Sequence, residues 1–85
     1  MRLEDKVAVV TGACGGIGQA IVAKFVAEGA SVIVADLDGA QAQQVAATFG
    51  DKARGLAVDV TDFGQVEAMV DAAEEHFGTL DVVVN

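Results

Sequence analysis

The sequence predicts an α/β protein whose parallel sheet is covered by helices on both faces. Four short apolar runs recur along the 85 residues. Each run is rich in β-branched residues and continuous rather than alternating, which is typical of strands buried on both sides. The predicted strands start at Val7, Ser31, Gly55 and Asp81, so successive starts are 24, 24 and 26 residues apart. Each interval therefore leaves room for one helix and two short loops.

The first strand is expected at residues 7–10 and the second at residues 32–35. The segment between them has apolar residues at intervals of three and four, which predicts a helix that ends before Gly29. Its expected buried face consists of Ile17, Ala20, Ile21 and Phe25. A second helix with the same periodicity is expected before Gly50, and its apolar residues are Ala42, Val45, Ala46 and Phe49.

The third strand is expected at residues 56–58 and the fourth at residues 82–84. The helix between them has the clearest apolar stripe in the chain, formed by Phe63, Val66, Val70, Ala73 and Phe77. Either Thr61 or Asp62 can cap its N-terminus, and Gly78 can terminate it. Met69 on this helix is interpreted as a core residue.

Right-handed crossovers place the first three strands side by side, and a reversal before the fourth gives the strand order 3-2-1-4 of a dinucleotide-binding half. The reversal rests on analogy with known folds. This order puts the first two helices on one face of the sheet and the third on the other. The fourth strand is then an edge without Pro, Lys or a bulge, so we expect self-association or pairing with a missing C-terminal half.

Charge and cysteine content limit the partners and the compartment. Thirteen Asp and Glu against five Lys and Arg give a net charge of −8, which disfavours nucleic acid and anionic membranes as partners. The single cysteine fits a reducing compartment, and we expect a cytoplasmic protein. The apolar run at residues 7–10 is too short for a signal sequence or a membrane span.

A glycine-rich loop directly follows the first strand, in the sequence Thr-Gly-Ala-Cys-Gly-Gly-Ile-Gly at residues 11–18. Glycines at a strand-to-helix turn let the backbone approach a phosphate, and the N–H groups at the helix start attract its charge. Glycines also serve tight turns and close packing, so the loop alone leaves both interpretations open. The loop lacks the Lys and Ser or Thr of a P-loop, which disfavours a nucleotide triphosphatase.

Three polar residues have both a functional and a plain structural interpretation. Asp36 ends the second strand, where it can accept both hydroxyls of an adenosine ribose, whereas Asp38 is the better candidate for a helix cap. Cys14 could be reactive at a helix start, but a small residue packed in a loop is the simpler interpretation. His76 is interpreted as a solvated residue at a helix end, and no metal site is expected.

Taken together, the segments KVAVV, TGACGGIG, VADLD, LAVDVTD and LDVVVN resemble the short-chain dehydrogenase/reductase family, in order and over the whole chain. The resemblance implies a partial Rossmann fold and an NAD(P)-dependent oxidoreductase that acts on an alcohol or carbonyl group. It also implies a set of cofactor-binding residues: Gly12, Cys14, Gly15, Gly16, Ile17, Gly18, Asp36, Leu37, Asp59, Val60 and Asn85.

Within that set, the resemblance assigns distinct roles. Gly12, Gly16 and Gly18 shape the turn. The Ile17 N–H binds the pyrophosphate, and Cys14 and Gly15 border the adenosine ribose. Asp59 accepts a hydrogen bond from the adenine amino group and Val60 flanks the ring, although Asp59 is also suited to forming a turn before Thr61. Asn85 corresponds to the first residue of the family motif Asn-Asn-Ala-Gly.

The catalytic Ser and the Tyr-x-x-x-Lys pair of the family follow the fourth strand and are absent here. We therefore expect residues 1–85 to be an NAD-binding half-domain, truncated after the fourth strand, with no catalytic residue of its own. NAD is expected rather than NADP because Asp36 would repel a 2′-phosphate. The alternatives are a non-catalytic or engineered Rossmann fragment that binds nucleotide or self-assembles, and an S-adenosylmethionine methyltransferase.

Overall fold

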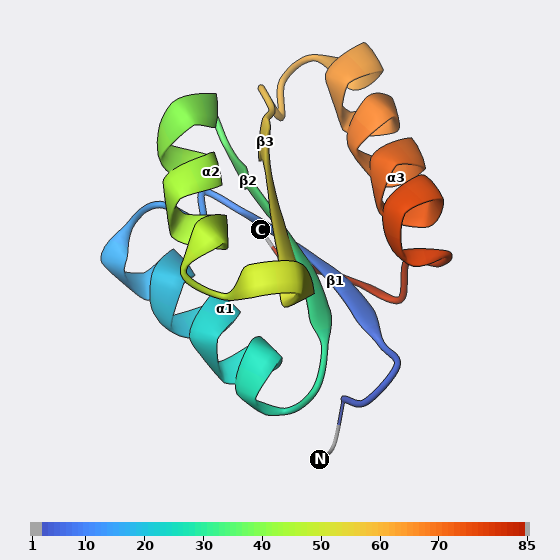
Figure 1. Ribbon diagram of the computed structural model, residues 1–85. Helices are drawn as coiled ribbons and strands as arrows, with labels where there is room; N and C mark the ends of the chain where they lie inside the picture. The colour runs from blue at the N-terminus through green and yellow to red at the C-terminus, as the bar shows by residue number, and fades with distance from the viewer. Residues whose placement is uncertain (1–2, 85) are drawn as a thin grey trace.

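The computed structural model describes residues 3–84 as strands and helices that alternate along the chain (Figure 1). The bounds are β1 Val7–Thr11, α1 Gly16–Ala27, β2 Ser31–Asp36, α2 Gly39–Ala47, η1 Gly50–Lys52 (a short 3-10 helix), β3 Ala53–Ala57, α3 Phe63–Phe77 and β4 Val82–Val84. The predicted α/β class and the order of elements are confirmed. In the described part of the chain, no helix is long and apolar enough to cross a membrane.

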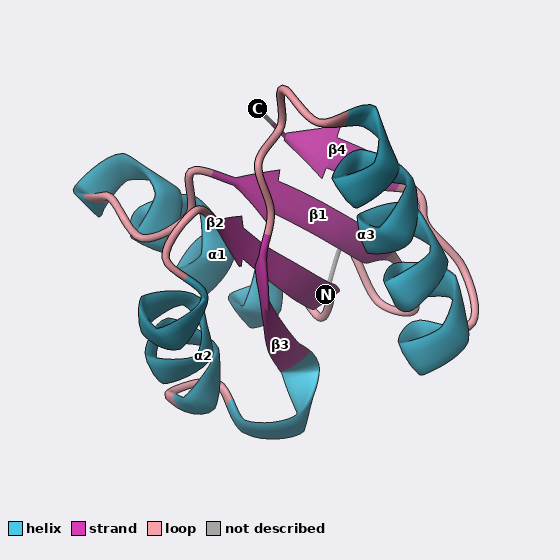
Figure 2. Cartoon of the chain, turned by 90° about the horizontal axis from the view of Figure 1, so that it is seen from above, coloured by secondary structure: helices cyan, strands magenta, loops and turns pink. Residues whose placement is uncertain are grey.

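The four strands form one parallel sheet in the order β3-β2-β1-β4, as predicted. Helices α1 and α2 pack on one face and α3 on the other (Figures 1 and 2). The pleat of β1 and β2 divides the core between these faces. Val10, Val32 and Val34 lie on the α1–α2 side. Val9 and Ile33 lie on the α3 side, where Met69 is buried as predicted.

Burial differs sharply between the central and the edge strands. Every residue of β1 and β2 except the terminal Thr11, Ser31 and Asp36 is buried. The sequence predicts the third strand at residues 56–58, but β3 begins earlier and ends at Ala57. The expectation of complete burial is wrong for this strand, because Ala57 is exposed and Leu56 only half-buried. At the opposite edge, the β4 residue Val83 is 50% exposed. Edge strands have one neighbour only, and α3 alone is too narrow to cover the whole of its face.

Three apolar residues predicted to face the core are exposed, two in α1 and one in α3, whereas the other residues of both predicted stripes are buried or half-buried. In α1, Ile17 and Ala20 are exposed, and Gly18 and Val22 are buried instead. The reason is that α1 approaches the preceding loop so closely that only a glycine fits between them. In α3, Phe63 is 78% exposed because the first turn of this helix extends beyond the carboxyl ends of the strands (Figure 1).

The predicted caps are present at the helix ends. Asp38 Oδ1 accepts a hydrogen bond from the Gln41 N–H at 3.1 Å, which caps α2. Asp62 Oδ1 accepts from the Gln65 N–H at 3.2 Å, so Asp62 rather than Thr61 caps α3. Gly78 ends α3 with a φ of 91°, a conformation that glycine adopts without steric cost. These caps fix where the loops at the carboxyl edge of the sheet begin and end.

Candidate functional site

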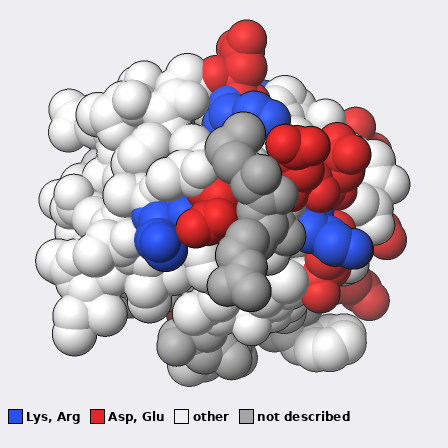
Figure 3. Space-filling view, turned by 90° about the horizontal axis from the view of Figure 1, so that it is seen from below, with Lys and Arg blue, Asp and Glu red and all other residues white. Residues whose placement is uncertain are grey.

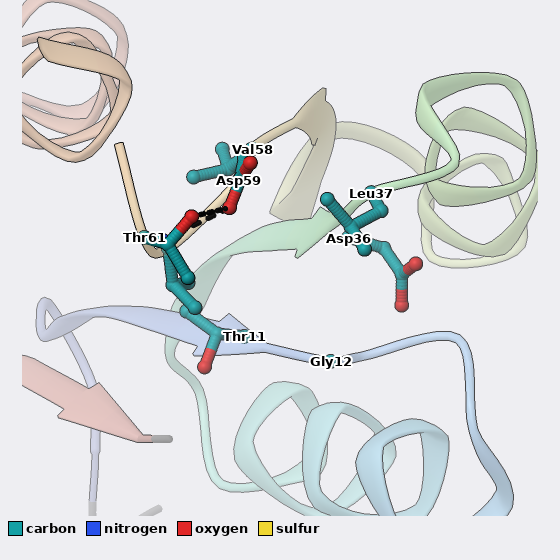
Figure 4. A pocket seen from close by; sticks show the side chains of 8 residues that line it. Thr11, Gly12, Asp36, Leu37, Val58, Asp59 and Thr61 are labelled. Atoms are coloured by element: carbon teal, nitrogen blue, oxygen red, sulfur yellow. Dashed lines mark hydrogen bonds between the residues drawn. The ribbon is translucent and has the colours of Figure 1, made fainter. Parts of the chain in front are cut away.

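A cleft of about 500 Å³ opens at the carboxyl ends of β1, β2 and β3. Its wall residues end β1 and β2 or lie directly after one of the three strands, and they are Thr11, Gly12, Asp36, Leu37, Val58, Asp59, Val60 and Thr61. Figure 4 labels all of them except Val60. Open parallel sheets bind their ligands at this edge, where the loops leave the strands. Most of the exposed surface inside the cleft is apolar, and both of its charged residues are acidic.

The glycine loop on the β1 side of the cleft contains two glycines that the fold itself requires. Gly12 has a φ of +62°, which side-chain-bearing residues rarely adopt. A Cβ on Gly18 would lie 2.6 Å from the Gly12 carbonyl oxygen and 2.7 Å from Ala13 Cα. The loop is further tied to the sheet because the Ala13 N–H donates to the Ala35 carbonyl at 3.1 Å.

The other two loop glycines have no such structural requirement. A Cβ on Gly16 would meet no atom within 4 Å, and one on Gly15 would meet only the Gly12 oxygen, at 3.8 Å. Gly15 is the N-cap of α1 and offers no side-chain oxygen, and the first turn carries no acidic residue. The N–H groups at this helix start are therefore available to an anion.

Asp36 connects the end of β2 with the glycine loop. Its Oδ2 accepts a hydrogen bond from the Cys14 N–H at 3.1 Å, and its Oδ1 accepts from the Asp38 N–H at 3.2 Å. These backbone donors, that of Cys14 first, lower the pKa of the Asp36 carboxyl below its usual value. A carboxylate with a lowered pKa stays ionised near neutral pH and accepts further hydrogen bonds from a ligand.

Cys14 packs against the apolar cluster between the sheet and helices α1 and α2. Burial, followed by the negative charge of Asp36, raises the pKa of its thiol. A raised pKa lowers the thiolate fraction and hence the reactivity. The structure thus favours the packing interpretation of Cys14.

Asp59 forms the turn that its position after β3 suggested, and it also lines the cleft. Its Oδ1 accepts hydrogen bonds from the Thr61 N–H at 2.9 Å and from the Thr61 hydroxyl at 2.6 Å (Figure 4). The Thr61 hydroxyl is the main cause of the lowered pKa of the Asp59 carboxyl. Sequence reasoning missed a second partner residue, Gln65, whose Oε1 accepts from the Asp59 N–H at 2.9 Å. Its place three residues after the cap Asp62 is the signal that could have revealed it.

The structure brings together only some of the residues predicted for the site. Gly12, Asp36, Leu37, Asp59 and Val60 line the cleft, in which Leu37 is 75% and Val60 56% exposed. Five further residues lie in the adjoining loop and at the start of α1, and they are Cys14, Gly15, Gly16, Ile17 and Gly18. Asn85 lies outside the described residues. Three lining residues were not predicted, and they are Thr11, Val58 and Thr61.

Outside the cleft, polar side chains form small local contacts. His76 is exposed on α3, with its Nδ1 3.5 Å from a guanidinium nitrogen of Arg54 and its ring edge-on to Phe77. Within residues 3–84, no three His, Cys, Asp or Glu side chains are grouped to hold a metal ion. On the face at the amino ends of the strands, Lys and Arg lie beside Asp and Glu rather than in a separate basic patch (Figure 3).

Comparison with known proteins identifies the family. The model of the short chain dehydrogenase family matches residues 6–85. The chain belongs to this family, which confirms the resemblance in the sequence motifs and excludes the methyltransferase alternative.

The relatives are oxidoreductases that are about three times as long as this chain. Galactitol 2-dehydrogenase from Agrobacterium fabrum is 49% identical over 85 residues, which are 100% of this chain and 33% of that protein. D-threitol dehydrogenase from Mycolicibacterium smegmatis is 44% identical over 87 residues, with coverages of 99% and 34%.

A solved relative confirms the arrangement of the elements. The crystal structure of 3-ketoacyl-(acyl-carrier-protein) reductase from Brucella melitensis, complexed with NADH, matches with a TM-score of 0.91 and 41% identity. The match covers 95% of this chain and 33% of that one. The partial Rossmann fold predicted from the sequence is therefore confirmed.

Proposed function

We propose that this chain is the NAD-binding part of an oxidoreductase that transfers a hydride between NAD(H) and an alcohol or carbonyl substrate. The observation that carries the proposal is the position of the Asp36 carboxylate, which the Cys14 N–H holds against the glycine loop at 3.1 Å. An ionised acid at the end of β2, beside a glycine loop, is suited to the hydroxyls of an adenosine ribose. The NADH in the Brucella melitensis relative supports the same cofactor class.

The remaining parts of the cofactor follow from the chemistry of the loops. The start of α1 would hold the pyrophosphate, because its N–H groups are uncapped and no side chain at Gly15 or Gly16 obstructs it. The adenine would lie between the exposed side chains of Leu37 and Val60, beside Asp59. Residues 1–85 would in this way serve as the dinucleotide-binding half of a longer enzyme.

NAD is favoured over NADP on electrostatic grounds. A 2′-phosphate would approach the Asp36 carboxylate, which is charged at neutral pH, as carboxyl groups of ordinary or lowered pKa are. None of the residues that line the cleft is Lys or Arg, so no nearby cation offsets the repulsion. The site would therefore reject the additional phosphate rather than only fail to bind it.

The residues of this chain bind and orient the cofactor, while the bound nicotinamide supplies the hydride chemistry. The two carboxyl groups in the cleft, Asp36 and Asp59, both have a lowered pKa and stay ionised near neutral pH. Groups in that state are poor proton donors to a substrate oxygen. We assign no catalytic residue within residues 1–85 and expect no dehydrogenase turnover from this chain alone.

Location and assembly are further parts of the proposal. The single cysteine supports a reducing compartment, and we place the protein in the cytoplasm. The outer edge of β4 has no neighbouring strand within residues 3–84 and carries the half-exposed Val83. This edge would pair with a second copy of the chain or with further sequence of the full enzyme.

Titration of the 85-residue chain with NAD and NADP, followed by NMR or calorimetry, tests the function. We expect NAD to bind more tightly, and Asp36→Ala to weaken NAD binding by about 1–3 kcal/mol, the range for charge-assisted hydrogen bonds. Asp71→Ala is the matched control, because it removes the same charge from an exposed position on α3 and should leave both affinities unchanged. Equal affinity of the unmodified chain for NAD and NADP would refute the assignment of Asp36.

A further inference from the structure

Gln65 is the third residue of α3 and forms hydrogen bonds with two residues of the loop that precedes this helix. Its Oε1 accepts from the Asp59 N–H at 2.9 Å, and its Nε2 donates to Asp62 Oδ2 at 3.4 Å. Its own N–H donates to Asp62 Oδ1 at 3.2 Å. One exposed glutamine therefore joins the helix cap to the wall of the cleft.

This arrangement differs from an ordinary capping box. In that motif, the side chain of the third helical residue bonds back to the N–H of the cap residue. Here the N–H of the cap residue Asp62 already donates to the Asp59 carbonyl at 3.0 Å. The Gln65 Oε1 instead bonds to the N–H of Asp59, which lies three residues before the cap in the loop that lines the cleft. Stability of the helix alone does not require this longer reach.

The consequence is that Asp59 is held at several points. Gln65 accepts its N–H, Asp62 donates to its carbonyl, and Thr61 donates twice to its Oδ1. Among the described residues, every hydrogen bond to the Asp59 carboxylate uses Oδ1. Oδ2 takes no part in these bonds and can accept a hydrogen bond from a ligand. The bonds that hold Oδ1 and the main chain of Asp59 also set the direction in which Oδ2 points.

We propose that Gln65 is a positioning residue that fixes the Asp59 carboxylate for selection of an adenine over a hypoxanthine base. The inference rests on the proposed function, because it requires the base of a dinucleotide to lie against Asp59. Adenine offers an amino group that donates to a carboxylate, whereas hypoxanthine has a carbonyl oxygen there, which the carboxylate repels. A carboxylate held in place discriminates strongly between the amino group and the carbonyl oxygen. A carboxylate that is free to rotate can move away from the carbonyl oxygen, so it discriminates less.

The test compares NAD with nicotinamide hypoxanthine dinucleotide in NMR titrations of the full 85-residue chain. Gln65→Met keeps the length and the helix propensity of the side chain and removes both of its hydrogen bonds. Gln41→Met is the matched control, because Gln41 is also the third residue after a cap and donates its N–H to that cap, Asp38, at 3.1 Å. Its variant should bind both dinucleotides as the unmodified chain does.

We expect the unmodified chain to bind NAD more tightly, and Gln65→Met to lower the ratio of the two affinities by about 2- to 12-fold, the span of one hydrogen bond. A purely structural role would lower both affinities equally and leave the ratio unchanged, which would overturn the proposal. Equal binding of both dinucleotides by the unmodified chain would overturn it as well. If the unmodified chain bound neither, the proposed function itself would fail, and this inference with it.

Discussion

Two glycines of the loop allow the needs of the fold to be separated from those of the cofactor. A Cβ on Gly18 would lie 2.6 Å from the Gly12 carbonyl oxygen, about 0.8 Å short of the 3.4 Å at which ordinary contact begins. The atoms in the way are backbone, so the loop or the helix must move. Overpacking of this kind destabilises proteins by about 1–3 kcal/mol. We therefore expect Gly18→Ala to lower the free energy of unfolding by that amount.

The same substitution at Gly16 should have the opposite pattern. Gly16 is the first residue of α1, its φ is not positive, and an added Cβ would meet no atom within 4 Å. Replacing a helical glycine by alanine gains up to about 1 kcal/mol, less in the first turn. The new methyl group would, however, occupy the space through which a pyrophosphate reaches the helix start. We expect NAD affinity to fall about tenfold, or about 1.4 kcal/mol, with stability unchanged or raised.

Urea unfolding followed by circular dichroism measures the first effect, and NMR titration with NAD measures the second. For a domain of this size, each kcal/mol corresponds to a shift of the melting temperature of about 4–8 °C. The loss of stability expected from Gly18→Ala is thus well above experimental error. If Gly16→Ala bound NAD as tightly as the unmodified chain, the start of α1 would not be the pyrophosphate site. If Gly18→Ala were fully stable, the close approach of α1 to the loop would not constrain the sequence.

Two further predictions concern acid stability and association. Because backbone N–H donors, that of Cys14 first, lower the pKa of Asp36 in the folded state, its contribution to stability is complete above the unfolded pKa of about 3.9. This contribution is lost as the pH falls through the folded pKa. We therefore expect the free energy of unfolding in urea to fall less steeply below about pH 4 in Asp36→Asn than in the unmodified chain. An equally steep fall in both proteins would show that Asp36 does not cause the acid sensitivity. At the β4 edge, Val83 is 50% exposed, and Val83→Lys should shift sedimentation from a dimer or larger species to the monomer. Val83→Thr keeps the β propensity and should retain more association. Unchanged sedimentation of the Lys variant would show that β4 is not the contact.

The sequence alone predicted the elements that local patterns define. Continuous valine-rich runs revealed the buried strands, and the positions of Asp38, Asp62 and Gly78 revealed helix ends, because caps act within one turn. The burial of individual helix residues was less predictable. Ile17 and Phe63 continue the apolar periodicity of their helices, but both lie in the first helical turn at the carboxyl edge of the sheet and are exposed. Which end of a helix extends past the sheet depends on contacts between distant segments.

Asp36 and Asp59 show how one sequence signal can lead to two different arrangements. Both are acids at the end of a parallel strand, and both have a carboxyl pKa that hydrogen bonds lower. Asp36 is bonded across 22 residues, to the Cys14 N–H, so it joins the ends of β1 and β2 at the point where a ribose would lie. Asp59 bonds Thr61, two residues away, and has its main chain fixed by Gln65. The order of strands brings Asp36 to the glycine loop because β2 is the neighbour of β1, whereas β3 is one strand further away. The role of an acid at this edge therefore follows from the position of its strand in the sheet, which the strand order supplies and the residue type does not.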